Sequence, residues 1–113
     1  MNYDLEIRTT EFSKKLIVIC REISKTPYNQ NIIGQVLRSG TSVGANYREA
    51  NGSVSKKDFS NKIHICKKEA KETMYWLELL KESEPSHSNA IGYLSKEAHE
   101  LTLIFSKIAF SSR

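Results

Sequence analysis

The fold of this chain is decided by residues 37–51, which read LRSGTSVGANYREAN. The stretch is small and polar, yet apolar residues and glycines recur in and just before it at the spacing of one helix face. That face comprises Ile33, Val36, Leu37, Gly40, Val43, Gly44 and Tyr47. A glycine inside a helix costs about 1 kcal/mol relative to alanine. Glycines at 40 and 44 on the buried side therefore predict close approach of a neighbouring backbone.

The opposite side of the same stretch carries a polar line, which comprises Arg38, Ser42, Asn46 and Glu49. These residues recur at helical spacing and point away from the expected core. Free helix surfaces are usually built from long Lys and Glu side chains rather than Ser and Asn. Two interpretations remain open: an ordinary solvated face, or a surface that meets another chain or a ligand.

Helical periodicity recurs in three further segments on either side of this one. The spacing predicts helices from Asp4 to Ser24, from Asn31 to Asn51, from Ser55 to the break at 84–89, and from Ala90 to Phe110. Pro27 cannot continue the first helix, and Asn-Gly-Ser at 51–53 is a turn of the kind that permits positive φ. Ser55, with Asp58 three residues on, resembles a capping box that starts the third helix.

The third helix has the most regular apolar stripe, which comprises Phe59, Ile63, Cys66, Ala70, Thr73, Leu77 and Leu80. Short connections make neighbouring helices antiparallel. The predicted fold is therefore all-α, an up-and-down antiparallel four-helix bundle, with one domain spanning residues 1–113.

Composition agrees with a globular helical chain. It has 113 residues, of which 39% are hydrophobic and 27% charged, with five Gly and two Pro. No signal peptide is visible at the start, and the longest apolar run, Leu16 to Cys20, is too short to span a bilayer. We therefore expect a cytoplasmic protein. Cys20 and Cys66 lack a Cys-x-x-Cys pattern, so we expect two reduced, packed thiols.

Signatures of enzymatic chemistry are absent from the sequence. His64, His87 and His99 have no ligand-type partner at helical spacing, so no metal site is predicted. Residues 40–44 (GTSVG) lack the Gly-Lys-Ser/Thr ending of a phosphate loop. We therefore expect a protein that is not an enzyme and that needs no cofactor. An active site assembled from distant residues is the weakest alternative.

The order of motifs resembles the 23S ribosomal RNA intervening-sequence family, whose members are four-helix bundle proteins. The resemblance runs from about Leu5 to Ile108. It is carried by RSGTSVGAN at 38–46 with Glu49, by Ser-x-x-Asp-Phe at 55–59, and by KEAKETMYWL at 68–77. The family's Arg, Ser, Asn and Glu pattern corresponds to the polar line. The sequence departs from the family at 47–48 and at Ala50, which affects the surface chemistry but not the fold.

The resemblance implies a bacterial cytoplasmic protein that assembles into a ring-like homopentamer. A link to RNA is implied because genes of the family lie inside ribosomal RNA insertions. The accessory proteins of diversity-generating retroelements are similar in fold, and they bind nucleic acid and a reverse transcriptase.

The third helix also carries a candidate nucleic-acid surface. The net charge is +4, and between Ser53 and Lys71 six lysines face only two acidic residues, Asp58 and Glu69. We define a basic line opposite the core stripe, comprising Lys57, Asn61, His64, Lys68, Lys71 and Tyr75. Lysines neutralise phosphates and release counterions, and an aromatic ring stacks on an unpaired base. The alternative is a solvated lysine face that serves solubility.

Several apolar residues lie outside the predicted core stripes. On the third helix these are Ile65, Trp76 and Leu79; on the fourth they are Leu103 and Phe110; on the first they are Ile7 and Val18. Single exposed apolar residues are normal. A patch around a tryptophan is rare on a soluble monomer, so we predict self-association.

The leading hypothesis is a homo-oligomeric bundle, pentameric by family resemblance, that binds RNA or another nucleic acid through the basic line. The polar line would then contribute to the subunit interface or to a groove beside it. The rival hypothesis is a protein-interaction scaffold, or accessory subunit, that docks a partner protein without touching nucleic acid.

Overall fold

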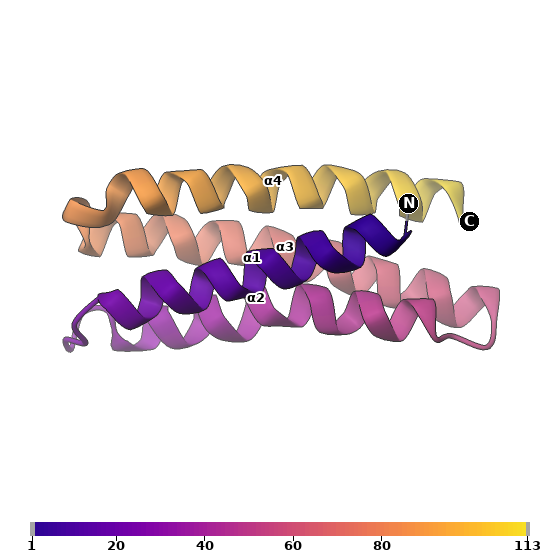
Figure 1. Ribbon diagram of the computed structural model, residues 1–113, viewed down its shortest axis with the longest axis horizontal. Helices are drawn as coiled ribbons and strands as arrows, with labels where there is room; N and C mark the ends of the chain where they lie inside the picture. The colour runs from indigo at the N-terminus through magenta and orange to yellow at the C-terminus, as the bar shows by residue number, and fades with distance from the viewer. Residues whose placement is uncertain (1, 113) are drawn as a thin grey trace.

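The computed structural model describes residues 2–112, and in that part of the chain it contains four long α-helices. They are α1 (Asn2–Glu22), α2 (Gln30–Asn51), α3 (Lys56–Ser83) and α4 (Ser88–Ser111), with a short 3-10 turn, η1 (Pro85–His87), before α4. The helices lie side by side along a body of 44 × 20 × 20 Å, and α1 begins at the end where α4 finishes (Figure 1). The predicted all-α, up-and-down four-helix bundle is confirmed.

The core is formed by the predicted stripes of all four helices. The largest fully buried side chains are Tyr47, Phe12, Phe105, Leu16, Ile63, Leu77, Leu80, Ile91 and Leu101. Tyr47 and Phe105 meet with their ring centroids 5.8 Å apart. Three residues expected in the core, Leu37, Phe59 and Ile108, are only half-buried and pack on its edge.

Gly40 and Gly44 mark the place where α1 approaches α2. A Cβ built on Gly40 would overlap Cδ1 of Leu16, and one built on Gly44 would lie 3.2 Å from Oγ1 of Thr9 and 3.5 Å from its carbonyl carbon. The close approach predicted from the sequence is therefore present. At Gly40 it is made by a buried leucine side chain rather than by backbone, and at Gly44 the neighbouring backbone is close.

The turn predicted after α2 is present at Gly52. Gly52 has φ −94° and ψ 6°, and its N–H donates to the carbonyls of Arg48 and Glu49. No residue of 2–112 has a positive φ, so this turn does not use the positive φ that its sequence permits. The helical hydrogen bonds continue through Gly52, and Ser53 N–H donates to Ala50 O at 3.1 Å.

The helix starts and stops follow local hydrogen bonds. Ser55 Oγ accepts from Asp58 N–H at 3.0 Å, which confirms the predicted cap of α3. Buried Asn29 holds the α1–α2 connection: its Oδ1 accepts from Thr26 N–H at 2.8 Å, and its Nδ2 donates to Ser24 O at 3.0 Å. The same Nδ2 donates to Glu84 Oε2 at 2.7 Å. Asn29 therefore ties two connections together at one end of the bundle.

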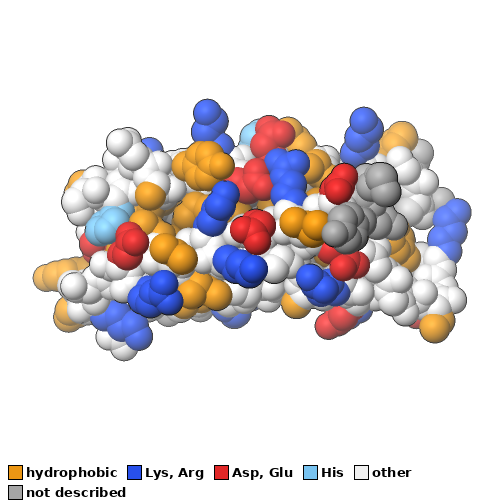
Figure 2. All heavy atoms as spheres, viewed as in Figure 1, with side chains coloured by type: hydrophobic (Ala, Val, Ile, Leu, Met, Phe, Trp, Pro, Cys, Tyr) orange, Lys and Arg blue, Asp and Glu red, His pale blue; other side chains and the backbone are white. Residues whose placement is uncertain are grey.

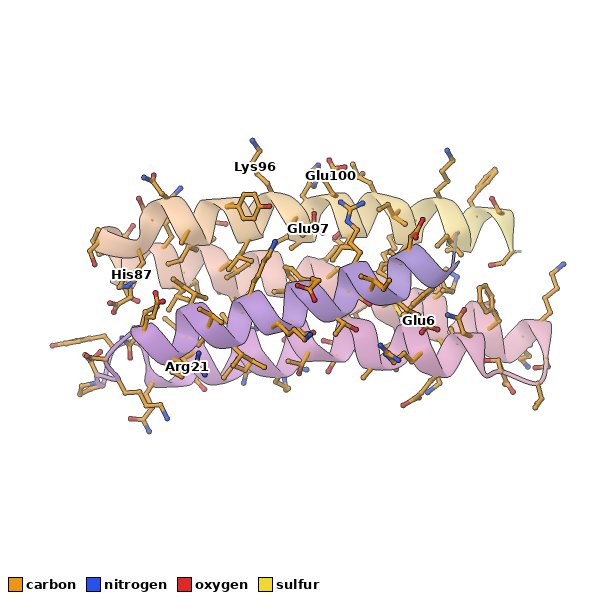
Figure 3. The ribbon with its side chains drawn as sticks, viewed as in Figure 1. Glu6, Arg21, His87, Lys96, Glu97 and Glu100 are labelled. Carbon is orange, nitrogen blue, oxygen red and sulfur yellow. The ribbon has the colours of Figure 1, made fainter. Side chains whose placement is uncertain are left out.

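Helix α1 runs diagonally across the bundle, and it packs less closely on α4 than on α2 (Figure 1). Arg8 bridges this looser seam by donating Nε and Nη2 to the two carboxylate oxygens of Glu97, at 2.7 and 2.8 Å. Glu97 lies between the two helices in Figure 3. Among the helices of residues 2–112, none combines the length and apolarity that crossing a membrane would require.

Candidate nucleic-acid interface

The basic line lies on the outward side of α3. All six of its side chains, Lys57, Asn61, His64, Lys68, Lys71 and Tyr75, are exposed. Their position follows from periodicity, because the same helix buries Ile63, Ala70 and Leu77 on its inner side.

The lysines of the basic line form no close ion pair among the described residues, although Lys68 is near enough to Glu72 to help lower the pKa of that carboxyl. In residues 2–112, none of Lys57, Lys68 and Lys71 forms an ion pair within 4.0 Å, whereas neighbouring Lys62 donates to Glu49 Oε1 at 2.6 Å. The opposite face of the molecule differs: over α1 and α4, positive and negative side chains are interleaved with apolar ones (Figure 2). Exposed cations on one side of one helix form a surface suited to phosphates.

Tyr75 ends the basic line next to the chain's single tryptophan. Its ring is 55% exposed, and it meets Trp76 nearly edge-on, with centroids 5.1 Å apart and an interplanar angle of 68°. Contact with a half-buried neighbour restrains the tyrosine ring while leaving part of its surface open.

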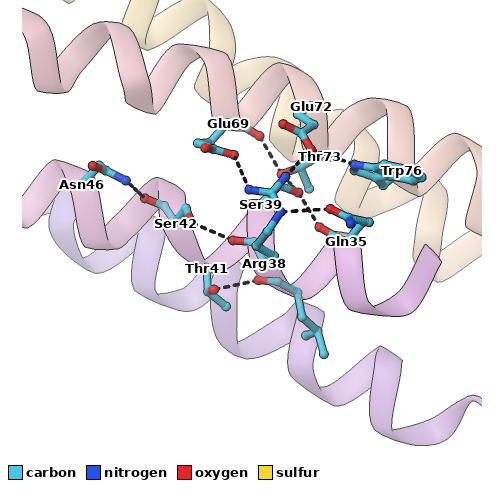
Figure 4. Close-up of polar contacts among 11 residues, drawn as sticks. Gln35, Arg38, Ser39, Thr41, Ser42, Asn46, Glu69, Glu72, Thr73 and Trp76 are labelled. Atoms are coloured by element: carbon cyan, nitrogen blue, oxygen red, sulfur yellow. Dashed lines mark hydrogen bonds and ion pairs between the residues drawn. The ribbon is translucent and has the colours of Figure 1, made fainter. Parts of the chain in front are cut away.

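The polar line contacts α3 along the seam between α2 and α3 (Figure 4). Arg38 pairs with Glu72 and lies 3.4 Å from Glu69 Oε1, while its Nε donates to Gln35 Oε1 at 2.9 Å. Trp76 Nε1 donates to Glu72 Oε2 at 3.0 Å. Arg38, Glu72 and Trp76 therefore form one cluster across the two helices.

The protonation states of this cluster follow from its contacts. The hydrogen bond from Trp76 holds the pKa of Glu72 below its usual value, with a further contribution from Arg38 against the opposing effect of burial. The hydrogen bond to Glu72 in turn raises the pKa of the Arg38 guanidinium. Both charges are therefore stabilised at neutral pH.

The other members of the polar line bond within α2 or to α3. Ser42 Oγ donates to Arg38 O at 2.6 Å, and Asn46 Nδ2 donates to Ser42 O at 2.9 Å. Glu49 accepts from Lys62 of α3. Ser42 and Asn46 thus donate to backbone carbonyls of their own helix instead of reaching across to α3.

Most of the predicted interface residues gather at the α2–α3 seam. We call this surface the α2/α3 face and define it by Arg38, Ser42, Asn46, Glu49, Ile65, Trp76 and Leu79. Its three apolar members on α3 are half-buried. Leu103 and Phe110 are 51% and 65% exposed on α4, which lies beside α3 and α1 and meets α2 across the core, where Phe105 packs against Tyr47. The structure does not bring these two residues to the α2/α3 face.

Sequence reasoning missed the partners beneath and beside Arg38. Thr73 Oγ1 donates to the buried Ser39 Oγ, 2.9 Å away, and is also 2.7 Å from Glu69 O; Ser39 Oγ lies 2.8 Å from Gln35 O (Figure 4). The sequence did contain a signal for these contacts. Ser39 belongs to one of the motifs that resemble the family, and Glu69, Glu72 and Thr73 belong to another. The structure shows that the two motifs meet.

A groove between α3 and α4 was also not anticipated. It has a volume of about 700 Å³, and two members of the basic line, Lys71 and Tyr75, lie on its wall. On the α4 side it is lined by Gly92, Ser95 and Lys96, among others. The glycine and serine were visible in the sequence, but their orientation toward α3 was not.

The two cysteines are free and buried, as expected. Burial raises the pKa of Cys20 to about 11 and that of Cys66 to about 12. Cys66 Sγ donates to Val43 O at 3.5 Å. Within residues 2–112, no group of three or more His, Cys, Asp or Glu side chains is placed to hold a metal ion.

These features define a small antiparallel four-helix bundle protein with a polar cluster between its second and third helices. The chain belongs to the 23S rRNA-intervening sequence protein family, whose model matches residues 3–107. The resemblance inferred from the motifs is thus confirmed.

A solved structure is similar over nearly the whole chain. It is the crystal structure of a protein with unknown function from the S23 ribosomal protein family of Bacteroides thetaiotaomicron VPI-5482. The two chains are 33% identical with a TM-score of 0.79, and the match covers 92% of this chain and 96% of that chain. A search of curated proteins found no match.

Proposed function

We propose that this protein is a non-enzymatic, homo-oligomeric bundle that binds RNA, or another nucleic acid, through the basic line of α3. The observation that carries the proposal is the row of exposed lysines that form no ion pair within 4.0 Å among residues 2–112. Each lysine that neutralises a phosphate releases condensed counterions, which favours binding at low salt. The family's description, as a 23S rRNA-intervening sequence protein, points to RNA as the first ligand to test. Such a ligand implies a cytoplasmic location.

Assembly strengthens this proposal. A ring of identical subunits, a homopentamer by family resemblance, repeats the basic line and converts weak contacts into avidity. The α2/α3 face supports assembly because Trp76, Ile65 and Leu79 leave apolar surface open beside the Arg38–Glu72 pair. Exposed Leu103 and Phe110 on α4 offer a second contact for the neighbouring subunit.

A binding series with structured RNA at rising salt tests the nucleic-acid proposal. The triple variant Lys57→Glu, Lys68→Glu, Lys71→Glu should weaken binding and reduce the slope of log Kobs against log salt by about 2 to 3. A matched control changes charge equally at three exposed residues on other elements: Arg21→Glu, Lys25→Glu and Lys107→Glu. Absence of binding at about 50 mM salt, or equal losses in both triple variants, would contradict the proposal.

The second candidate function is a protein-interaction scaffold that docks a partner on the α2/α3 face. The half-buried Trp76 next to an ion pair favours it, because tryptophan and arginine are enriched at the energetic centres of interfaces. Capture of a partner with and without nuclease separates the two functions. A partner that survives nuclease but is lost in Trp76→Ala or Asn46→Ala supports the scaffold.

A further inference from the structure

The groove between α3 and α4 is open because the side chains that α4 directs toward α3 at this point are small and leave the space between the helices unfilled. Farther along the same seam, Thr102 is buried and its Oγ1 lies 3.9 Å from Met74 Sδ. Near the start of α4, the α3-facing positions are Gly92 and Ser95. A Cβ built on Gly92 would meet Lys81 Nζ at 3.9 Å, an ordinary van der Waals distance, so a side chain fits above this glycine without a clash.

The groove has an apolar floor and charged walls. Half-buried Met74 lies along it, and the fully buried core residues Leu77 and Ile91 lie beneath. Lys71 and Lys81 of α3 and Lys96 of α4 line it as well, and among residues 2–112 none of them forms an ion pair. Lys96 projects outward from α4 in Figure 3.

Two carboxylates, Glu78 and Glu100, also line the groove. A continuous duplex backbone presents phosphates alone, and these carboxylates would repel it. A single nucleotide presents both an anionic phosphate and a base with N–H donors. Glutamate accepts hydrogen bonds from such base edges. Mixed charge beside an apolar floor therefore suits one nucleotide unit better than a duplex.

Tyr75 supplies the surface on which a base would stack. It lies on the wall of the groove, 55% exposed, with its ring held edge-on against Trp76. Unpaired bases stack on aromatic rings with little regard to sequence. Lys71, one turn earlier on α3, is positioned for the adjoining phosphate.

We infer that the α3/α4 groove is a binding site for an unpaired nucleotide of a single-stranded nucleic acid, with the base on Tyr75 and the phosphates on either side of it on Lys71, Lys81 and Lys96. The inference rests on the proposed function and deepens it. The basic line then guides the strand along α3, and the groove selects single strands over duplexes. Recognition of one flipped or looped nucleotide at a time is the expected consequence.

Gly92 makes the inference testable without disturbing the core. Gly92→Leu places an alkyl side chain in the groove, at a backbone position with room for a Cβ. Gly34→Leu is the matched control, because Gly34 is an exposed helical glycine on α2 with nothing within 4 Å of a built Cβ. Tyr75→Ala is paired with Tyr93→Ala, which removes an exposed tyrosine of α4 that lies outside this groove.

The probe is a fluorescein-labelled, unstructured single-stranded RNA of twelve nucleotides, measured by anisotropy beside the same strand in a duplex. We expect the wild type to bind the single strand more tightly than the duplex, with Trp76 fluorescence changing on binding. Gly92→Leu and Tyr75→Ala should each weaken single-strand binding by roughly tenfold, and both controls should stay within about twofold. Circular dichroism confirms that each variant is folded.

The possible failures are distinguishable. If Gly92→Leu and Tyr75→Ala bind like their controls while the triple lysine variant loses binding, the groove inference is wrong and the proposed function stands. Equal binding of single strand and duplex by the wild type also overturns the groove inference alone. If the wild type binds neither probe, the inference and the proposed function fall together.

Discussion

The close packing of α1 on α2 can be tested by comparing two substitutions, Gly40→Ala and Gly34→Ala. Each adds one methyl group to α2. Both glycines are inside α2, so Gly→Ala gains about 1 kcal/mol of helix propensity at either position. At Gly34 nothing opposes that gain. At Gly40 the new Cβ overlaps the fully buried Leu16, and overpacking of this kind costs about 1–3 kcal/mol. The propensity terms cancel in the comparison, so Gly40→Ala should be less stable than Gly34→Ala by about 1–3 kcal/mol.

Urea denaturation at one fixed protein concentration, followed by circular dichroism, gives the difference in unfolding free energy. In thermal melts the two variants should differ by several degrees, at roughly 3–6 °C per kcal/mol for a chain of this size. Leu16→Ala provides a second check. It should cost about 2–5 kcal/mol alone but less in the Gly40→Ala background, because the added methyl group fills part of the cavity. Equal stabilisation by Gly40→Ala and Gly34→Ala would refute the close approach of Leu16.

Three further outcomes follow from the contacts of the described residues. The folded-state pKa of Glu72 is lowered, so its contribution to stability is present above its unfolded pKa of about 4.3 and is lost as pH falls through the folded value. The difference in unfolding free energy between the wild type and Glu72→Gln, about 1 kcal/mol or less at pH 7, should therefore shrink toward pH 3. Urea titrations at several pH values measure it, and a difference that stays constant with pH would count against the Arg38–Glu72 pair. Cys20 and Cys66, with pKa values raised to about 11 and about 12, should resist a thiol reagent at pH 8 in the native protein and react fully in denaturant; rapid native reaction would show that the thiols are accessible. Thr73→Val should cost about 1 kcal/mol by removing the bond to Ser39, and adding Ser39→Ala should cost less than the sum of the two single changes; strict additivity in chemical denaturation would disprove the coupling.

Two motifs that are far apart in the sequence meet in the bundle. Arg38 and Ser39 belong to the first motif, and Glu69, Glu72 and Thr73 belong to the second. In the bundle they form one cluster, with a buried hydroxyl pair beneath an exposed ion pair. The motifs therefore describe one site rather than two, and any ligand or partner of the α2/α3 face would meet both.

Helix positions, core residues and antiparallel order were predictable because each depends on local properties. Apolar residues at helical spacing specify a buried face, and prolines and caps such as Ser55 specify where a helix begins or ends. The bounds moved by a few residues, since Asn29 ties the α1–α2 connection to the distant Glu84 and the short turn η1 precedes α4. The turn at Gly52 was predictable, but its φ was not, because glycine permits a positive φ without requiring one.

The sequence by itself determined which residues each helix would bury and which it would expose, because side-chain direction along a helix repeats with a fixed period. It did not determine which exposed face would lie beside which. Tertiary packing decided that Arg38 meets Glu72 across 34 positions of sequence, that Leu16 fills the space left by Gly40, and that Gly92 opens a groove beside Tyr75. Those pairings depend on the relative rotation and tilt of packed helices, which no single helix encodes.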